Sequence, residues 1–213
     1  MNGKKILLVE GKDDQHVIYA IRDSHGIDKD SFIIQEKQGV DNLFEGLEVN
    51  LIEGSSAIER IGIIIDADQD LNARWQKTLN ILRKADYQNL PTQPEATGTI
   101  IEQFFKPIFG VWIMPDNQLR GMLEDFLEFL VPDKDKNEVW IKAVKCSQEI
   151  LDEIGEQKRF SEIHLSKAKI HAYLAWQEEP GKPFGTAITA KYLQADNPHC
   201  ERFVEWLDRL FVK

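Results

Sequence analysis

Three acidic side chains stand directly after short apolar runs of the sequence, where they could bind a metal ion. Glu10 follows the run Lys5–Val9 (KILLV). Asp66 and Asp68 follow the run Ile61–Ile65 (IGIII). Carboxylates gathered without a counter-charge repel one another, and a bound divalent cation relieves that repulsion. Because hard oxygen ligands without a nearby His or Cys favour Mg²⁺ or Mn²⁺ over zinc, metal-assisted chemistry is expected.

The apolar runs themselves predict the elements that position these acids. Lys5–Val9 and Ile61–Ile65 are continuously apolar, which is typical of strands buried on both faces of a parallel sheet. In open parallel sheets, ligands bind beyond the carboxyl ends of the strands. If the two strands are parallel neighbours, Glu10, Asp66 and Asp68 converge at one edge of the sheet.

The alternation of strands and helices continues through residues 1–131. Two further strands are predicted at Ser31–Ile34 and Val111–Met114, with a turn at Gly39. Helical spacing of apolar residues predicts helices over 13–23, 41–52, 71–84 and 119–131. Asp70 is expected to cap the helix that starts at Leu71, and Asp13 or Asp14 the first helix. The pattern predicts an α/β fold with a mostly parallel four-stranded sheet flanked by helices.

The organisation changes after Pro132. Residues 133–137 (DKDKN) form a polar hinge, and helices are predicted over 138–153, 161–176, 186–193 and 198–211. The expected organisation is an α/β domain over residues 1–131 and an all-helical C-terminal extension over residues 132–213.

The composition limits the class of partner. The 213 residues carry 26 Lys and Arg against 36 Asp and Glu, a net charge of -10, which argues against a chain-wide basic surface for duplex DNA. A local phosphate site remains compatible with this charge where carboxylates hold divalent metals. The two cysteines form no disulfide or zinc pattern, and no apolar stretch approaches membrane-spanning length. A cytoplasmic protein without a membrane partner is expected.

The acidic motifs resemble the Toprim domain, the metal-binding catalytic domain of topoisomerases, bacterial primases and OLD-type nucleases. The resemblance covers about the first 130 residues and is carried by Leu7–Gly11 (LLVEG), Gly39 and Asp66-Ala67-Asp68. It implies a Toprim-like Rossmannoid fold. It also implies that Glu10 acts as general acid/base or metal ligand and that Asp66 and Asp68 hold Mg²⁺ or Mn²⁺.

Two further resemblances concern the rest of the chain. Gly121–Asp125 (GMLED) resembles the acidic helix of OLD-type nucleases, which implies that Glu124 is another metal ligand. Those nucleases use a lysine beyond this helix, a place that Lys167 or Lys169 could fill as a catalytic residue. The whole chain, including the motifs Lys167–His171 (KAKIH), Leu174–Trp176 (LAW) and Pro180–Pro183 (PGKP), also looks like a small family of uncharacterised Toprim-related proteins. The OLD-type resemblance implies nucleic acid, DNA or RNA, as the substrate and a partner ATPase as a possible companion.

The expected function is that of a Mg²⁺- or Mn²⁺-dependent nuclease or a related phosphodiester-processing enzyme. One alternative is a Toprim-fold module that binds a nucleotide or a protein partner without catalysis. Another is a receiver-like signalling domain that uses Asp13, Asp14 and Asp66. In receiver domains, however, the acidic pair ends the first strand directly, and here Glu10 occupies that point.

Each candidate residue also has an ordinary structural interpretation. Acids after strands often cap helices or face solvent. Glu124 can belong to the solvated face of an amphipathic helix, and Lys167 and Lys169 can be solvent-exposed. The five tryptophans are expected in the core instead of acting as base-stacking platforms.

Overall fold

A five-stranded sheet lies at the centre of the computed structural model, which describes residues 3–52, 57–153 and 160–213. The strands are β1 (Lys4–Val9), β2 (Ile33–Glu36), β3 (Ile58–Asp66), β4 (Thr99–Ile101) and β5 (Ile108–Met114). Their order is β2-β1-β3-β5-β4, and all neighbouring pairs are parallel except β4 with β5. The α/β class and the four predicted strands are therefore confirmed. The edge strand β4 was not predicted, because three residues are too short to show a periodic pattern.

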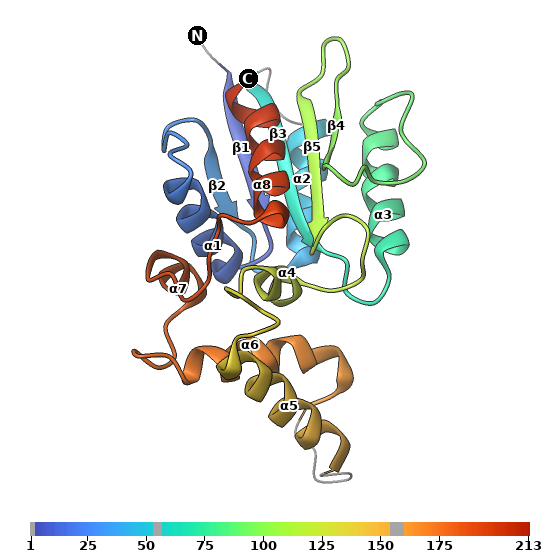
Figure 1. Cartoon of the computed structure of the whole chain (residues 1–213). Helices are drawn as coiled ribbons and strands as arrows, with labels where there is room; N and C mark the ends of the chain where they lie inside the picture. The colour runs from blue at the N-terminus through green and yellow to red at the C-terminus, as the bar shows by residue number, and fades with distance from the viewer. Residues whose placement is uncertain (1–2, 53–56, 154–159) are drawn as a thin grey trace.

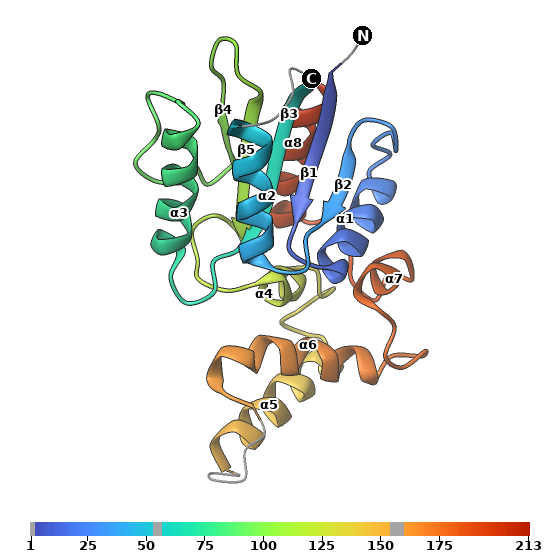
Figure 2. The same cartoon turned by 180° about the vertical axis from the view of Figure 1, so that it is seen from behind.

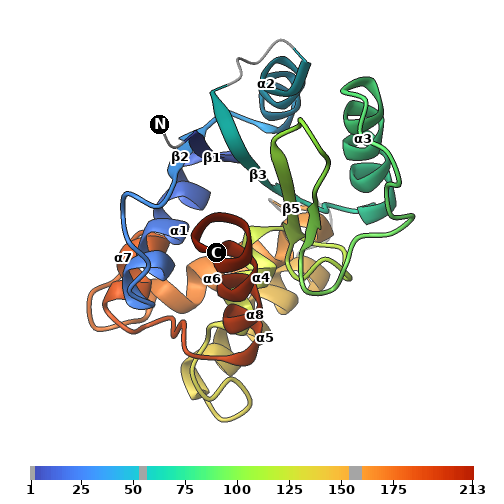
Figure 3. The same ribbon diagram turned by 90° about the horizontal axis from the view of Figure 1, so that it is seen from above.

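Helices cover both faces of the sheet (Figures 1 and 2). Helix α1 (Lys12–Ser24) and helix α8 (Pro198–Leu207) lie on one face, and α2 (Val40–Ile52) and α3 (Leu71–Lys84) lie on the other, as Figure 3 shows from above. Successive strand side chains enter opposite cores: Leu7 and Val9 pack on the α1 side, whereas Ile6 and Leu8 pack on the α2 side. Burial on both faces explains why these strands are continuously apolar in sequence.

The remaining helices gather beyond the carboxyl ends of the parallel strands. They are α4 (Leu123–Phe129), α5 (Glu138–Glu153), α6 (Leu165–Ala175) with the preceding 3₁₀ turn η2 (Glu162–His164), and α7 (Phe184–Thr189). Helices α5 and α6 pack together below α4 in Figure 1, and α7 packs against α1. The chain after Pro132 is therefore helical in its described part, as predicted.

The C-terminal helix closes one face of the sheet. Gly62 of β3 and Gly110 of β5 are register partners, and a Cβ on either would lie within 3 Å of the Leu210 side chain. Leu210 and Phe211 belong to η3 (Asp208–Val212), and Phe211 stacks on Phe32, which precedes β2; all three lie in the core. The boundary between residues 131 and 132 stays a prediction, but residues well beyond it complete the core of the sheet.

Two polar contacts fix the end of this C-terminal segment. The Lys5 ammonium donates to the Phe211 carbonyl at 2.8 Å, and the Arg60 guanidinium donates to the Leu210 carbonyl at 2.7 Å. Cations from β1 and β3 thus satisfy terminal carbonyl groups of the last helical turn, which carry partial negative charge.

Some predicted boundaries differ from the structure. Gly11, and neither Asp13 nor Asp14, is the N-cap of α1, because the Asp14 carboxylate reaches back to the Gly11 amide. Asp70 does cap α3, accepting from the Ala73 amide at 2.9 Å. The helix predicted from Leu119 begins only at Leu123. The Asp116 carboxylate accepts hydrogen bonds from the Gln118 and Leu119 amides, which holds these residues in a turn before the helix.

The predicted core positions and the membrane prediction can also be compared with the structure. Four tryptophans are buried, whereas Trp176 is 48 % exposed. Cys146 is exposed and Cys200 is buried, both as free thiols. Within the described residues, no helix has the length and apolar character needed to cross a membrane.

Candidate functional site

Glu10 is held in place immediately after β1. Its side-chain Oε1 accepts a hydrogen bond of 2.8 Å from the Asp66 amide, at the end of the neighbouring strand. Its own carbonyl accepts from the Gly39 amide at 2.8 Å. Gly39 has a φ of 119°, a left-handed conformation that a residue with a Cβ rarely adopts, so the predicted turn depends on glycine. The carboxylate of Glu10 is therefore held by the end of β3, and its backbone by the turn that follows β2.

Asp66 connects the sheet to the acidic helix α4. It is the last residue of β3, and its Oδ1 accepts from the Leu123 amide at 2.9 Å. Leu123 is the first residue of α4, where backbone N–H groups lack helical partners. The strand-end carboxylate thus fixes the start of the helix that carries Glu124.

Glu124 is 4 % exposed and forms an ion pair with Lys167 of α6, at 3.0 Å between Oε1 and Nζ. Lys169 pairs instead with Glu128, one turn further along α4, at 3.6 Å. Of the two lysines considered from the sequence, the structure brings Lys167 to the predicted metal-ligand Glu124. The hydrogen bond to Glu124 is also the main reason why the pKa of Lys167 is raised.

Asp68 lies apart from Asp66 in its contacts. Its φ of 50° is left-handed, and its backbone forms an isolated bridge with Gly121 through two hydrogen bonds of 2.8 Å. The Asp68 carboxylate forms an ion pair with Arg74 of α3. The two acids of the Asp-x-Asp motif therefore share an edge of the sheet but have different partners.

Asp14 is an acidic neighbour that the sequence did not assign to the site. It is buried on the first turn of α1, and its Oδ2 accepts from the Gly11 amide at 3.0 Å. Burial and, next, the nearby charge of Glu10 raise the pKa of Asp14 to about 7. The spacing from Gly11 is that of a capping residue, and only the receiver-like alternative grouped Asp14 with Asp66.

The carboxylates at this edge disfavour one another's charge. Burial is the main cause that raises the pKa of Asp66 well above its usual range, and Glu10, Asp14 and Glu124 raise it further. Burial also raises the pKa of Glu10, although the Asp66 amide and Arg74 act in the opposite direction. The fold therefore gathers more negative charge here than the neighbouring cations neutralise.

The donor set fits a hard divalent cation in its chemistry. Within the described residues, no three His, Cys, Asp or Glu side chains form a ready-made cage for an ion. Mg²⁺ keeps several waters and is commonly held by only one or two carboxylates, so such a cage is not required. The hydrogen bonds and ion pairs of the described chain engage one carboxylate oxygen each of Glu10, Asp66 and Glu124. The second oxygen of each is available to a metal ion or its waters.

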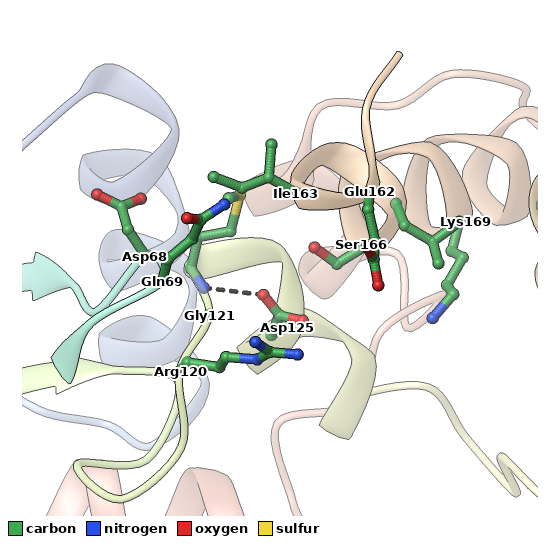
Figure 4. Close-up of a pocket in the computed structure, with 11 residues that line it drawn as sticks. Asp68, Gln69, Arg120, Gly121, Asp125, Glu162, Ile163, Ser166 and Lys169 are labelled. Atoms are coloured by element: carbon green, nitrogen blue, oxygen red, sulfur yellow. Dashed lines mark hydrogen bonds between the residues drawn. The ribbon is translucent and has the colours of Figure 1, made fainter. Parts of the chain in front are cut away.

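A polar cavity of 280 Å³, whose lining is drawn in Figure 4, shares Asp68 with the acids at this edge of the sheet. Asp68, Gly121 and Asp125 line it from the sheet and α4, and Ser166 and Lys169 line it from α6. Asp125 accepts from the Met122 amide at 2.8 Å, which fixes the wall between the cavity and the start of α4. The structure therefore offers a concave space next to the carboxylates.

Comparison with known proteins gives a family but no activity. The family model described as "Protein of unknown function (DUF3226)" matches residues 4–212, which span the sheet, the acidic edge and the C-terminal helices. No curated protein and no solved structure matches the chain. Because the match covers nearly the whole sequence, the chain belongs to the DUF3226 family.

Proposed function

We propose that the protein is a Mg²⁺- or Mn²⁺-dependent nuclease with a Toprim-like site. The observation that carries this proposal is the meeting of Glu10, Asp66 and Glu124 at the carboxyl ends of β1 and β3, with Lys167 bound to Glu124. Acidic oxygen ligands beside a lysine match the needs of phosphodiester hydrolysis, in which a metal and a cation meet a phosphate. The Toprim resemblance of the sequence supports the same proposal.

The residues divide the expected roles among them. Glu10, Asp66, Asp68 and Glu124 would hold the metal, which when bound lowers the pKa of an attacking water and stabilises the leaving oxygen. Glu10 is oriented by the Asp66 amide and is the group placed to accept a proton. Lys167 is half-exposed and is paired with Glu124; once it leaves this partner, it would neutralise charge on the phosphate. Lys169, which is paired with Glu128, is the alternative for this role.

The substrate proposed is a nucleic acid, DNA or RNA. The net charge of -10 predicts weak and salt-sensitive binding to duplex DNA unless a metal or a partner is present. A partner ATPase, implied by the OLD-type resemblance, would supply such binding, and it stays a prediction.

The test is a nuclease assay on single-stranded and nicked DNA and on RNA, with Mn²⁺ or Mg²⁺ and with EDTA. We expect Glu10→Gln and Asp66→Asn to reduce the rate at least a hundredfold, since each removes a charged ligand but keeps the hydrogen-bonding shape. Glu201→Gln, an exposed site on α8, is the matched control and should retain full activity. Equal activity of Glu10→Gln, Asp66→Asn and the parent protein would exclude this site as the catalytic centre.

A second candidate function has one observation in its favour. Lys167 neutralises Glu124, and Arg74 neutralises Asp68, so two of the four proposed ligands already have cationic partners. This arrangement favours a non-catalytic Toprim-fold module that binds a nucleotide or a protein partner. Saturable nucleotide binding with no hydrolysis by the parent protein would select this alternative.

A further inference from the structure

The cavity beside the carboxylates is built by three separate segments. Residues 68–69 follow β3, residues 120–122 precede α4, and the third wall comes from η2 and α6. Figure 4 shows Asp68 and Gln69 on one side and Glu162, Ser166 and Lys169 on the other. The volume of 280 Å³ is just below the roughly 300–1,000 Å³ of small-molecule sites. A group of nucleotide size fits such a space, and a duplex does not.

The cavity walls combine apolar and hydrogen-bonding surfaces. Ile163, Leu165 and Met122 are apolar. Gln69 and Ser166 offer polar groups that can both donate and accept. A nucleobase has a flat apolar face and a polar edge, and single-stranded bases are bound through both. These walls therefore match the chemistry of an unpaired base.

Arg120 and Lys169 are the cations that line the cavity, and Asp68, Asp125 and Glu162 are its acids. Lys169 is paired with Glu128, and the Asp68 carboxylate is paired with Arg74. Within the part of the chain that the structure describes, no hydrogen bond or ion pair engages the exposed Arg120 guanidinium. A planar guanidinium binds phosphate through two parallel hydrogen bonds, so Arg120 is suited to hold a phosphodiester.

The cavity is continuous with the proposed metal site along the chain. Met122 lines the cavity, and the next residue, Leu123, donates its amide to Asp66. Asp125 lines the cavity, and the preceding residue, Glu124, is a proposed metal ligand. Asp68 itself lines the cavity, so the cavity shares one side chain with the proposed metal ligands.

We infer that this cavity binds one nucleotide of a single-stranded nucleic acid, next to the phosphate that is cleaved, and that Arg120 holds the phosphate of that nucleotide. This inference rests on the proposed nuclease function and adds to it the strand form of the substrate. It makes Arg120 a substrate-binding residue in addition to the acids and lysines recognised in the sequence.

Steady-state kinetics with Mn²⁺ test the inference, using DNA and RNA oligonucleotides of one sequence, single-stranded and duplex. Arg120→Gln removes a charge-assisted contact to the phosphate, so KM should rise roughly tenfold or more while kcat stays within about twofold. Gln69→Trp, at an exposed position of the cavity wall, should also raise KM by filling the space. Arg83→Gln, an exposed arginine on α3 outside the cavity, is the control and should change neither constant.

The outcomes separate this inference from the proposed function. Mn²⁺-dependent hydrolysis with unchanged KM in both Arg120→Gln and Gln69→Trp would overturn the cavity inference and leave the nuclease proposal intact. Equal KM for single-stranded and duplex forms would also overturn it. If KM is lower for single-stranded DNA than for RNA, or the reverse, the nucleic acid with the lower KM is the preferred substrate. A rise of that KM in Arg120→Gln supports the inference.

A binding experiment keeps the inference testable without catalysis. Calorimetric titration with a single-stranded tetranucleotide, with Ca²⁺ present, should give an affinity that falls at least tenfold in Arg120→Gln and not in Arg83→Gln. If this binding is found but no hydrolysis occurs, the single-strand-binding role of the cavity and of Arg120 stands and the nuclease proposal fails. Absence of any binding by the folded parent protein would overturn the inference.

Discussion

The environment of Asp14 raises the pKa of its carboxyl group to about 7. The folded chain holds it buried beside Glu10 and raises its pKa from 3.8 to about 7. Between these two pH values the folded state binds more protons than the unfolded state. The contribution of Asp14 to stability is therefore greatest below about pH 4 and is lost as the pH rises to about 7.

Asp14→Asn should remove that pH dependence, because the amide carries no charge and its oxygen can still accept from Gly11. Both proteins are measured in EDTA. From pH 4 to pH 7, the free energy of unfolding of the parent protein should fall by roughly 2–4 kcal/mol more than that of the variant. Urea unfolding at several pH values measures this difference. A constant difference between the two proteins over this range would show that Asp14 titrates normally.

Lys167 compensates the buried charge of Glu124, so its removal should destabilise the fold. In Lys167→Met the Glu124 carboxylate loses its 3.0 Å partner in a site that is 4 % exposed. A loss of about 1–2 kcal/mol is expected, below the value for a fully buried pair because half of the Lys167 side chain faces solvent. In denaturant unfolding, Lys167→Met should cost less stability in a protein that already carries Glu124→Gln than in the parent protein. An equal cost in the two proteins would argue against coupling of the two residues.

At the scale of elements, the contact between the C-terminal helix and the sheet depends on two adjacent glycines. A Cβ on Gly110 would lie 2.4 Å from a Leu210 methyl group, so the helical segment packs directly on the strand backbone. Leu210 is fully buried, and its side chain occupies the space that larger residues would fill at Gly62 and Gly110.

Leu210→Ala should destabilise the protein by about 2–5 kcal/mol, and Gly110→Ala by about 1–3 kcal/mol, since one leaves a cavity and the other overpacks the contact. The double variant should lose less than the sum, because the alanine at 110 partly fills the space left by Leu210. Thermal or urea unfolding of the four proteins gives the coupling energy. Strict additivity would show that Leu210 does not rest on Gly110 in solution.

At the scale of the whole molecule, the proposed metal site predicts that divalent metal stabilises the acidic fold. The net charge of -10 includes the carboxylates that raise each other's pKa at the end of the sheet. A cation that binds only the folded state adds about 2.7 kcal/mol of stability at a hundred times its Kd. For a chain of this size the melting temperature should then rise by roughly 5–10 °C.

Differential scanning calorimetry with MnCl₂ or MgCl₂ measures this rise. Asp66→Asn and Glu10→Gln should remove it, and Glu201→Gln should keep it. A rise of the same size in all four proteins would indicate non-specific screening of the acidic surface in place of binding at this edge.

The strands that frame the site were predictable, and the reason is local. Lys5–Val9 and Ile61–Ile65 are buried on both faces, so continuous apolar runs are the only pattern they can carry. The strand β4 escaped prediction because it is short. Helix α4 starts later than predicted because the Asp116 carboxylate accepts hydrogen bonds from nearby backbone amides, which competes with helix formation.

The sequence by itself determined that Glu10 and Asp66 each follow a strand, because continuous apolar runs mark both strands. That the two strands are neighbours was decided by the tertiary structure. Only the tertiary structure decided that Asp14 faces Glu10, that Lys167 instead of Lys169 reaches Glu124, and that Arg120 lines a cavity beside them. These contacts join segments that are far apart in the chain. Their geometry depends on how α4, α6 and the sheet pack together, and no local pattern encodes that packing.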